Sequence, residues 1–184
     1  MKKELTVAAL CLLFVTAAPA QGIGLYDIGG AIGFVSVSPS GPSDSFTGFG
    51  FNARANLGEL TTNLYLVPEL NFLSVSEDYE GGSWKFSDFA INGNVQYRFD
   101  MDGSVQPYVG GGLGLNFVKS TVEIDDFFGF GGSASATSTE IGINLIGGAL
   151  FNLDGNITPF GEFRYVLVSN MNHLMIQAGI MYAL

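Results

Sequence analysis

The charged side chains that could do chemistry in this sequence stand at alternate positions within otherwise apolar segments. Glu162 and Arg164 lie two residues apart, a spacing that places both on one face of a β-strand. Such groups could form an ion path or gate, or they could pair into a salt-bridge and hydrogen-bond plug that fills a narrow interior. We predict the plug, a structural interior charge network whose members are Arg54, Glu69, Asp88, Arg98, Glu162 and Arg164.

His173, the single histidine, is the natural candidate for a general base. A histidine activates a serine or cysteine only when the two side chains lie within hydrogen-bond reach. The nearest serine is Ser169, and no serine lies two residues from the histidine. We therefore interpret His173 as a polar residue at a loop end and predict no catalytic residue. A lipid-modifying enzyme stays as an alternative that needs a nucleophile and base pair.

Two acidic stretches could in principle bind ions or partners. Residues 100–103, Asp-Met-Asp-Gly, begin like a calcium loop but lack its later ligands and closing glutamate, so we predict a turn and no metal or cofactor site. Residues 129–139 are a low-complexity stretch that predicts a loop. The acidic and aromatic residues just before it form a predicted surface contact loop: Asp125, Asp126, Phe127 and Phe128.

The bulk composition indicates which elements must position these residues. The chain of 184 residues is 47% hydrophobic and 13% charged, with a mean hydropathy of +0.34, whereas a typical soluble domain is about 25% charged. The longest uncharged apolar run, 5–20, is shorter than the roughly 20 residues of a membrane-spanning helix. A chain that lives in lipid without such helices must close a sheet on itself, because every backbone polar group needs a partner there.

Period-2 alternation recurs along the chain and predicts strands. One face is rich in Phe, Leu and Ile, and the other in Asn, Gln and Gly. Bulky apolar residues outside and small polar residues inside favour a membrane barrel over a soluble ligand-binding barrel. The predicted fold is all-β, a single eight-stranded antiparallel up-and-down transmembrane β-barrel, whose segments lie near residues 25–38, 49–57, 63–76, 88–99, 105–121, 141–151, 162–167 and 173–184.

The predicted connections differ at the two ends of this barrel. Those at 58–62, 100–104 and 154–156 are short, whereas those at 39–45, 77–83 and 123–138 are longer and only 170–172 is brief. Short turns on the periplasmic side and longer loops outside are the outer-membrane arrangement. Outward aromatic residues near both predicted ends, such as Tyr97 and Phe49, indicate interfacial girdles.

The first twenty residues predict a cleaved signal peptide, which leaves 21–184 as the barrel domain. Lys2 and Lys3 precede an apolar stretch, and Ala18-Pro19-Ala20 forms a small-residue cleavage site. A retained helical anchor is the alternative. Removal of two lysines and Glu4 changes the formal net charge from −10 to −11, so nucleic acid is a poor partner.

Particular stretches resemble one family. Residues 107–114, Pro-Tyr-Val-Gly-Gly-Gly-Leu-Gly, and 161–165, Gly-Glu-Phe-Arg-Tyr, are similar to strands of the small outer-membrane β-barrel proteins, which include the OmpA membrane domain, OmpX and opacity-type proteins. The chain departs from the pattern by ending on Leu184 instead of an aromatic residue.

The resemblance implies a protein of the bacterial outer membrane, in contact with lipid and lipopolysaccharide and inserted by the barrel-insertion machinery as a monomer. It also implies a structural or surface-interaction role with loops presented to extracellular ligands. The alternative is a porin-like transporter of ions or small apolar solutes.

Overall fold

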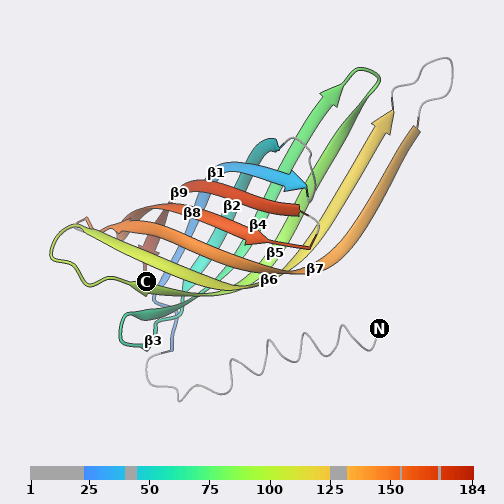
Figure 1. Ribbon diagram of the computed structural model, residues 1–184. Coiled ribbons are helices and arrows are strands. Elements are labelled where there is room, and N and C mark those ends of the chain that lie inside the picture. The colour runs from blue at the N-terminus through green and yellow to red at the C-terminus, as the bar shows by residue number, and fades with distance from the viewer. Residues whose placement is uncertain (1–22, 40–44, 125–131, 154, 170) are drawn as a thin grey trace, which may run out of the picture.

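The chain forms one antiparallel sheet that curls into a barrel (Figure 1). The computed structural model describes residues 23–39, 45–124, 132–153, 155–169 and 171–184. The predicted signal peptide, residues 1–20, lies outside the described residues and stays a prediction. The strands are β1 (Asp27–Pro39), β2 (Phe46–Asn56), β3 (Glu59–Thr61), β4 (Leu64–Tyr79), β5 (Gly82–Arg98), β6 (Val105–Ile124), β7 (Gly132–Phe151), β8 (Ile157–Leu167) and β9 (Met171–Ala183).

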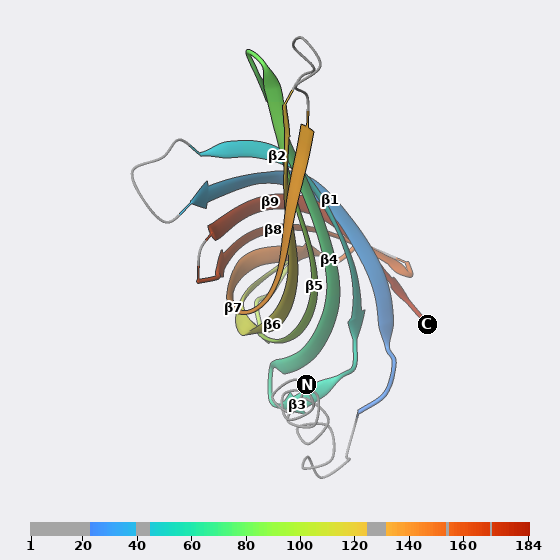
Figure 2. The same cartoon turned by 90° about the vertical axis from the view of Figure 1, so that its right-hand side faces the viewer.

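Eight of these strands close the barrel. Their hydrogen-bonded order is β2-β1-β9-β8-β7-β6-β5-β4, and a further pairing of β2 with β4 joins the two ends of the sheet. Figure 2 shows the strands curving around a common axis. The ninth element, β3, is a three-residue strand that pairs only with β4 within the described residues. The predicted eight-stranded antiparallel barrel is therefore confirmed. The described residues contain no helix long and apolar enough to span a membrane.

The two ends of the barrel differ. At one end, called the termini end here, β1 begins opposite the last residues of β9, with Asp27 paired to Ala183. At the other, the loop end, the prediction of a loop at 77–83 is wrong. Strand β4 continues to Tyr79 and β5 begins at Gly82, so only Glu80 and Gly81 make the turn. Gly81 has φ 93°, a conformation that glycine adopts without steric cost.

At the loop end β4, β5, β6 and β7 rise past the other strands (Figure 1). Strand β2 pairs with β4 no further than Val75, and β8 pairs with β7 only from Ile143 onward. Beyond those points the four strands pair with one another alone, and we call residues 76–79, 82–85, 119–124 and 132–139 the raised sheet. The prediction that 129–139 forms a loop is wrong from Gly132 onward, because these residues pair with β6 in an unbroken register.

Side chains alternate between the two surfaces of the barrel wall as the sequence predicts. Large apolar residues point outward, with Phe49 70% and Ile32 76% exposed. The buried interior positions carry amides and charges in the middle of the barrel, including Asn52, Asn94 and Gln177. Large apolar side chains that cover the outside of a closed sheet indicate that this surface contacts lipid, because a surface in water rarely carries so extensive an apolar area. Outward aromatic residues lie toward both ends, as in the Phe34–Phe49 and Tyr97–Phe99 ring pairs.

Candidate functional site

Four of the six predicted network residues meet inside the barrel. Arg54 on β2 and Glu162 on β8 form a bidentate pair, with Nη1–Oε2 and Nη2–Oε1 distances of 2.8 and 3.1 Å. Arg164 contacts Glu162 at 2.9 Å and also donates to Glu69 on β4. Glu69 in turn lies 3.5 Å from Arg54. We call these four residues the ionic cluster; two cations and two anions give it a net charge of zero.

Neutral side chains complete the surroundings of the ionic cluster. The Tyr108 hydroxyl donates to Glu162 at 2.7 Å, and the Gln177 amide donates to the same carboxylate at 2.6 Å. Asn52 accepts from Arg54 and donates to Glu69. Several partners for each carboxylate are what a buried charge needs, since an unpaired one is costly in a low-dielectric interior.

The other two predicted network residues, Asp88 and Arg98, point inward but lie apart from the ionic cluster. The Arg98 guanidinium stacks on the ring of Tyr65, 4.0 Å from its centroid. Asp88 faces His173 from across the barrel, with an Oδ2–Nδ1 distance of 3.7 Å. The six predicted network residues therefore divide into one connected group of four and two residues that lie apart from it.

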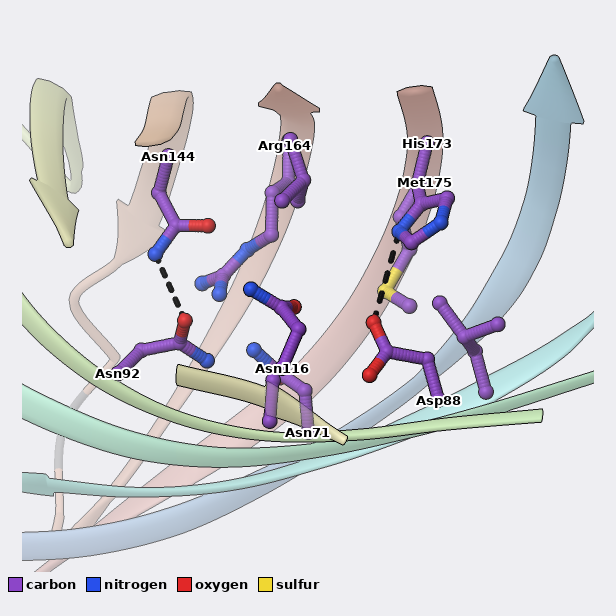
Figure 3. Close-up of a pocket in the computed structure, with 11 residues that line it drawn as sticks. Asn71, Asp88, Asn92, Asn116, Asn144, Arg164, His173 and Met175 are labelled. Carbon is purple, nitrogen blue, oxygen red and sulfur yellow. Dashed lines mark hydrogen bonds and ion pairs between the residues drawn. The ribbon is translucent and has the colours of Figure 1, made fainter. Parts of the chain in front are cut away.

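His173 lines a polar pocket between the ionic cluster and the loop end (Figure 3). His173 is 1% exposed, lies within β9, and its ring is 5.6 Å from that of Phe86. The interpretation of His173 as a polar residue at the end of a loop is therefore wrong, because it is a buried strand residue. Asn144 spans the pocket to donate to Asn92 at 2.8 Å. The described pocket lining holds no serine, threonine or cysteine. Nor do the described residues bring three or more His, Cys, Asp or Glu side chains together as a metal site.

The polar interior has an apolar layer on each side. Toward the termini end, the buried layer contains Phe160, Tyr108 and Met181 with Ala31, Ile146 and Leu150. Toward the loop end, Phe86, Met175 and Leu73 pack with Val35, Val37 and Val75, and Trp84 and Phe46 lie against them. The predicted polar plug thus lies between two buried apolar layers, and further buried polar side chains, Gln96 and Asn56, lie toward the termini end.

The raised sheet carries its own ion pair. The Lys85 ammonium donates to Glu123 at 2.7 Å on the outer face. This hydrogen bond and the positive charge of Lys85 lower the pKa of the Glu123 carboxyl below its ordinary value. On the opposite face the Trp84 indole donates to Ser120 at 2.9 Å. The predicted contact residues Asp125, Asp126, Phe127 and Phe128 lie outside the described residues.

Sequence reasoning did not assign Tyr108, Gln177, Asn52 or His173 to the interior site. The inward orientation of such residues could nevertheless be predicted. Gln177 and His173, for example, alternate with the outward residues of the last segment. What the alternation did not supply was the cross-barrel pairing that brings β2, β4, β6, β8 and β9 to one level.

A closed antiparallel sheet with apolar residues outside and a filled interior defines a small transmembrane β-barrel. Residues 6–183 match the family described as "Outer membrane protein beta-barrel domain", and the chain belongs to this family. Its place is accordingly the bacterial outer membrane.

Individual relatives agree with that assignment. Over 82 residues, 45% of this chain, the sequence is 30% identical to Protein opa of Haemophilus influenzae, and the match spans 64% of that protein's length. The crystal structure of Neisserial surface protein A matches 89% of this chain and all of its own, with a TM-score of 0.66 and 20% identity. The attachment invasion locus protein Ail of Yersinia pestis matches 86% of this chain and all of its own, with a TM-score of 0.53 and 18% identity. At these identities the two structures show a common fold.

Proposed function

We propose that this protein is a non-conducting surface barrel that supports the outer membrane and presents its raised sheet to extracellular contacts. The observation that carries the proposal is the difference between the two parts of the molecule along the barrel axis, the closed interior and the raised sheet. Buried apolar layers lie toward both ends of the barrel, and paired charges lie between them. The strands that rise above it pair with one another and carry polar side chains outside.

The filled interior argues against the porin-like alternative. Eight strands leave an interior just wide enough for side chains, and here the Arg54–Glu162 and Arg164–Glu69 contacts span that width. A solute or ion would have to displace the buried apolar layers as well, and desolvating an ion among Phe160 or Phe86 is costly. The six charged residues predicted as an interior network serve, in this proposal, to hold strands together.

An enzymatic role lacks support from the pocket chemistry. His173 and Asp88 could orient one another as a base and its partner, but a nucleophile is also required. The described pocket lining offers none.

The partner class is constrained by charge. Ail of Yersinia pestis has been crystallised with the heparin analogue sucrose octasulfate, a polyanion. Between residues 21 and 184 the present chain has five basic residues, and three of them, Arg54, Arg98 and Arg164, face the interior. That leaves Lys85, which is paired with Glu123, and Lys119. An exterior this acidic favours neutral or basic partners over polyanions, while the apolar belt contacts outer-membrane lipid and lipopolysaccharide.

Planar-bilayer recording on the refolded protein tests the non-conducting barrel. We expect no stepwise conductance from the wild type. Arg164→Ala should also give none, because both apolar layers remain in place. A steady single-channel conductance in the wild type would overturn this half of the proposal and favour the transporter.

Cell binding tests the surface role. The assay measures adhesion of cells to a surface coated with extracellular proteins. Cells that make the wild-type protein should adhere better than cells that make a variant whose raised sheet is trimmed to the level of β1 and β2. Heat-dependent gel mobility of the trimmed variant verifies that its barrel has folded. Equal adhesion by the two strains would contradict a contact role for the raised sheet.

A further inference from the structure

Strand β7 has a long open edge. Its pairing with β6 is continuous from Gly132 to Phe151, whereas its pairing with β8 begins only at Ile143. Within the described residues, the side of 132–142 that faces away from β6 has no neighbouring strand. Residues 132–139 are all exposed. A row of unpaired backbone groups of this kind is a template for another extended chain.

The ladder fixes which residues point at the open edge. Asn152 N–H donates to Ser104 O on the β6 side, and the β6–β7 register runs without a shift from there to Gly132. Backbone groups alternate sides along an antiparallel strand, so even-numbered residues of β7 bond to β6. The odd-numbered residues Ser133, Ser135, Thr137 and Thr139 therefore direct N–H and C=O outward.

In the part of the chain that the structure describes, this edge lacks the devices that normally protect one. Proteins blunt exposed edges with charges, prolines, bulges or covering segments. Residues 132–139, Gly-Ser-Ala-Ser-Ala-Thr-Ser-Thr, contain no charge and no proline, and their register shows no bulge. The matching free part of β4, residues 76–79, is half as long and carries Glu77 and Asp78. The contrast within one raised sheet singles out the edge of β7.

We propose that the open edge of β7 binds an extended, neutral or basic segment of an extracellular protein by β-strand addition. Only another backbone offers donors and acceptors at the spacing of Ser133, Ser135 and Thr137. The small hydroxyl side chains add little steric discrimination. The acidic exterior and its few lysines favour a segment with basic residues over an acidic one.

A second copy in the same membrane is a poorer occupant. Neighbouring barrels share one orientation, so both β7 strands run from the loop end toward the termini end. Strands of membrane barrels tilt by about 35–45° from the axis, and a two-fold axis along the membrane normal would make two β7 edges cross at a large angle. They could not align over the length of 132–139.

The inference rests on the proposed outward placement of the raised sheet, and its test uses the refolded full barrel in nanodiscs. The probe is a twelve-residue peptide of alternating threonine and lysine, measured by fluorescence anisotropy. Two edge variants, S135P and T137P, each remove one outward N–H while the β6–β7 hydrogen bonds, made by even residues, remain. S135A and T137A are matched controls, because they change the same side chains and keep the N–H.

We expect each proline variant to weaken peptide binding at least tenfold and each alanine variant to change it less than twofold. Replacing the peptide's lysines by glutamate should weaken binding at least fivefold at low salt. A peptide N-methylated along one edge should fail to bind the wild type, a result that does not depend on any variant folding.

Equal binding by wild type and proline variants, or equal loss in the alanine variants, would overturn the inference. So would a dimer in nanodiscs that S135P dissociates, since a second copy would then occupy the edge. If the peptide fails to bind but cells still adhere to extracellular proteins through the raised sheet, the strand-addition inference alone is lost and the proposed function stands.

Discussion

Arg164→Ala is the sharpest test of the ionic cluster. The side chain is 1% exposed and contacts two carboxylates, Glu162 at 2.9 Å and Glu69. Its removal leaves Arg54 as the single cation beside two buried anions. The net charge of the ionic cluster changes from zero to −1, in a region where Glu69 and Glu162 are each 2% exposed.

The expected magnitude follows from that imbalance. Removing one partner of a buried ion pair typically costs about 3–5 kcal/mol, because the other charge stays desolvated without compensation. Arg54 lies 3.5 Å from Glu69 and can compensate part of the loss, so we place the decrease in unfolding free energy near the lower limit, at about 3 kcal/mol. Replacing both partners with neutral groups should cost far less, because no uncompensated charge remains.

The assay is guanidinium unfolding of the barrel in detergent micelles, followed by tryptophan fluorescence and gel mobility. Arg164→Met combined with Glu69→Gln restores charge balance, and this double variant should be more stable than Arg164→Met alone. Lys119→Ala, an exposed lysine outside the ionic cluster, should change the unfolding free energy by less than about 0.5 kcal/mol. A loss below about 1 kcal/mol for Arg164→Ala would refute the view that this network stabilises the barrel.

Two further predictions concern other parts of the wall. Gly179→Ala should destabilise the barrel by about 1–3 kcal/mol, because its Cβ would come within 2.7 Å of Ala31 Cβ; Gly147→Ala, where a Cβ meets nothing within 4 Å, is the control, and equal effects would contradict the packing argument. NMR titration of Glu123 should give a pKa below that of an ordinary glutamate, and Lys85→Met should raise this pKa toward the ordinary value. The pKa of Glu123 is lower in the folded state than in the unfolded state. The contribution of this ion pair to the free energy of unfolding is therefore present above the unfolded-state pKa, and it is lost as the pH falls through the folded-state pKa.

The barrel itself could be predicted from the sequence because lipid imposes a strict rule on one surface. Every outward position within the hydrocarbon must be apolar, so alternation is strong where the wall crosses the membrane, as in 49–57 and 88–99. Above the membrane both faces of a strand meet water, and this rule lapses. Residues 132–139 therefore show no hydrophobic period, although they pair with β6 residue by residue. The prediction of a loop at 129–139 failed from Gly132 onward for this reason.

The site could be predicted in part, and the missing information was register. Alternation places Asp88 and Glu69 on the inner face, but it does not give their heights. The structure pairs Glu69 with Asn92, four residues along β5 from Asp88. At about 3.3 Å per residue that separation is roughly 13 Å along the strand, so Asp88 lies closer to the loop end than Asn92 and its partner Glu69. The same register places the amide of Asn92, rather than a charge, beside Glu69, and it leaves Asp88 at the level of His173. Which inward charges become partners is thus decided by how neighbouring strands slide past one another, and a single strand's sequence carries no record of that offset.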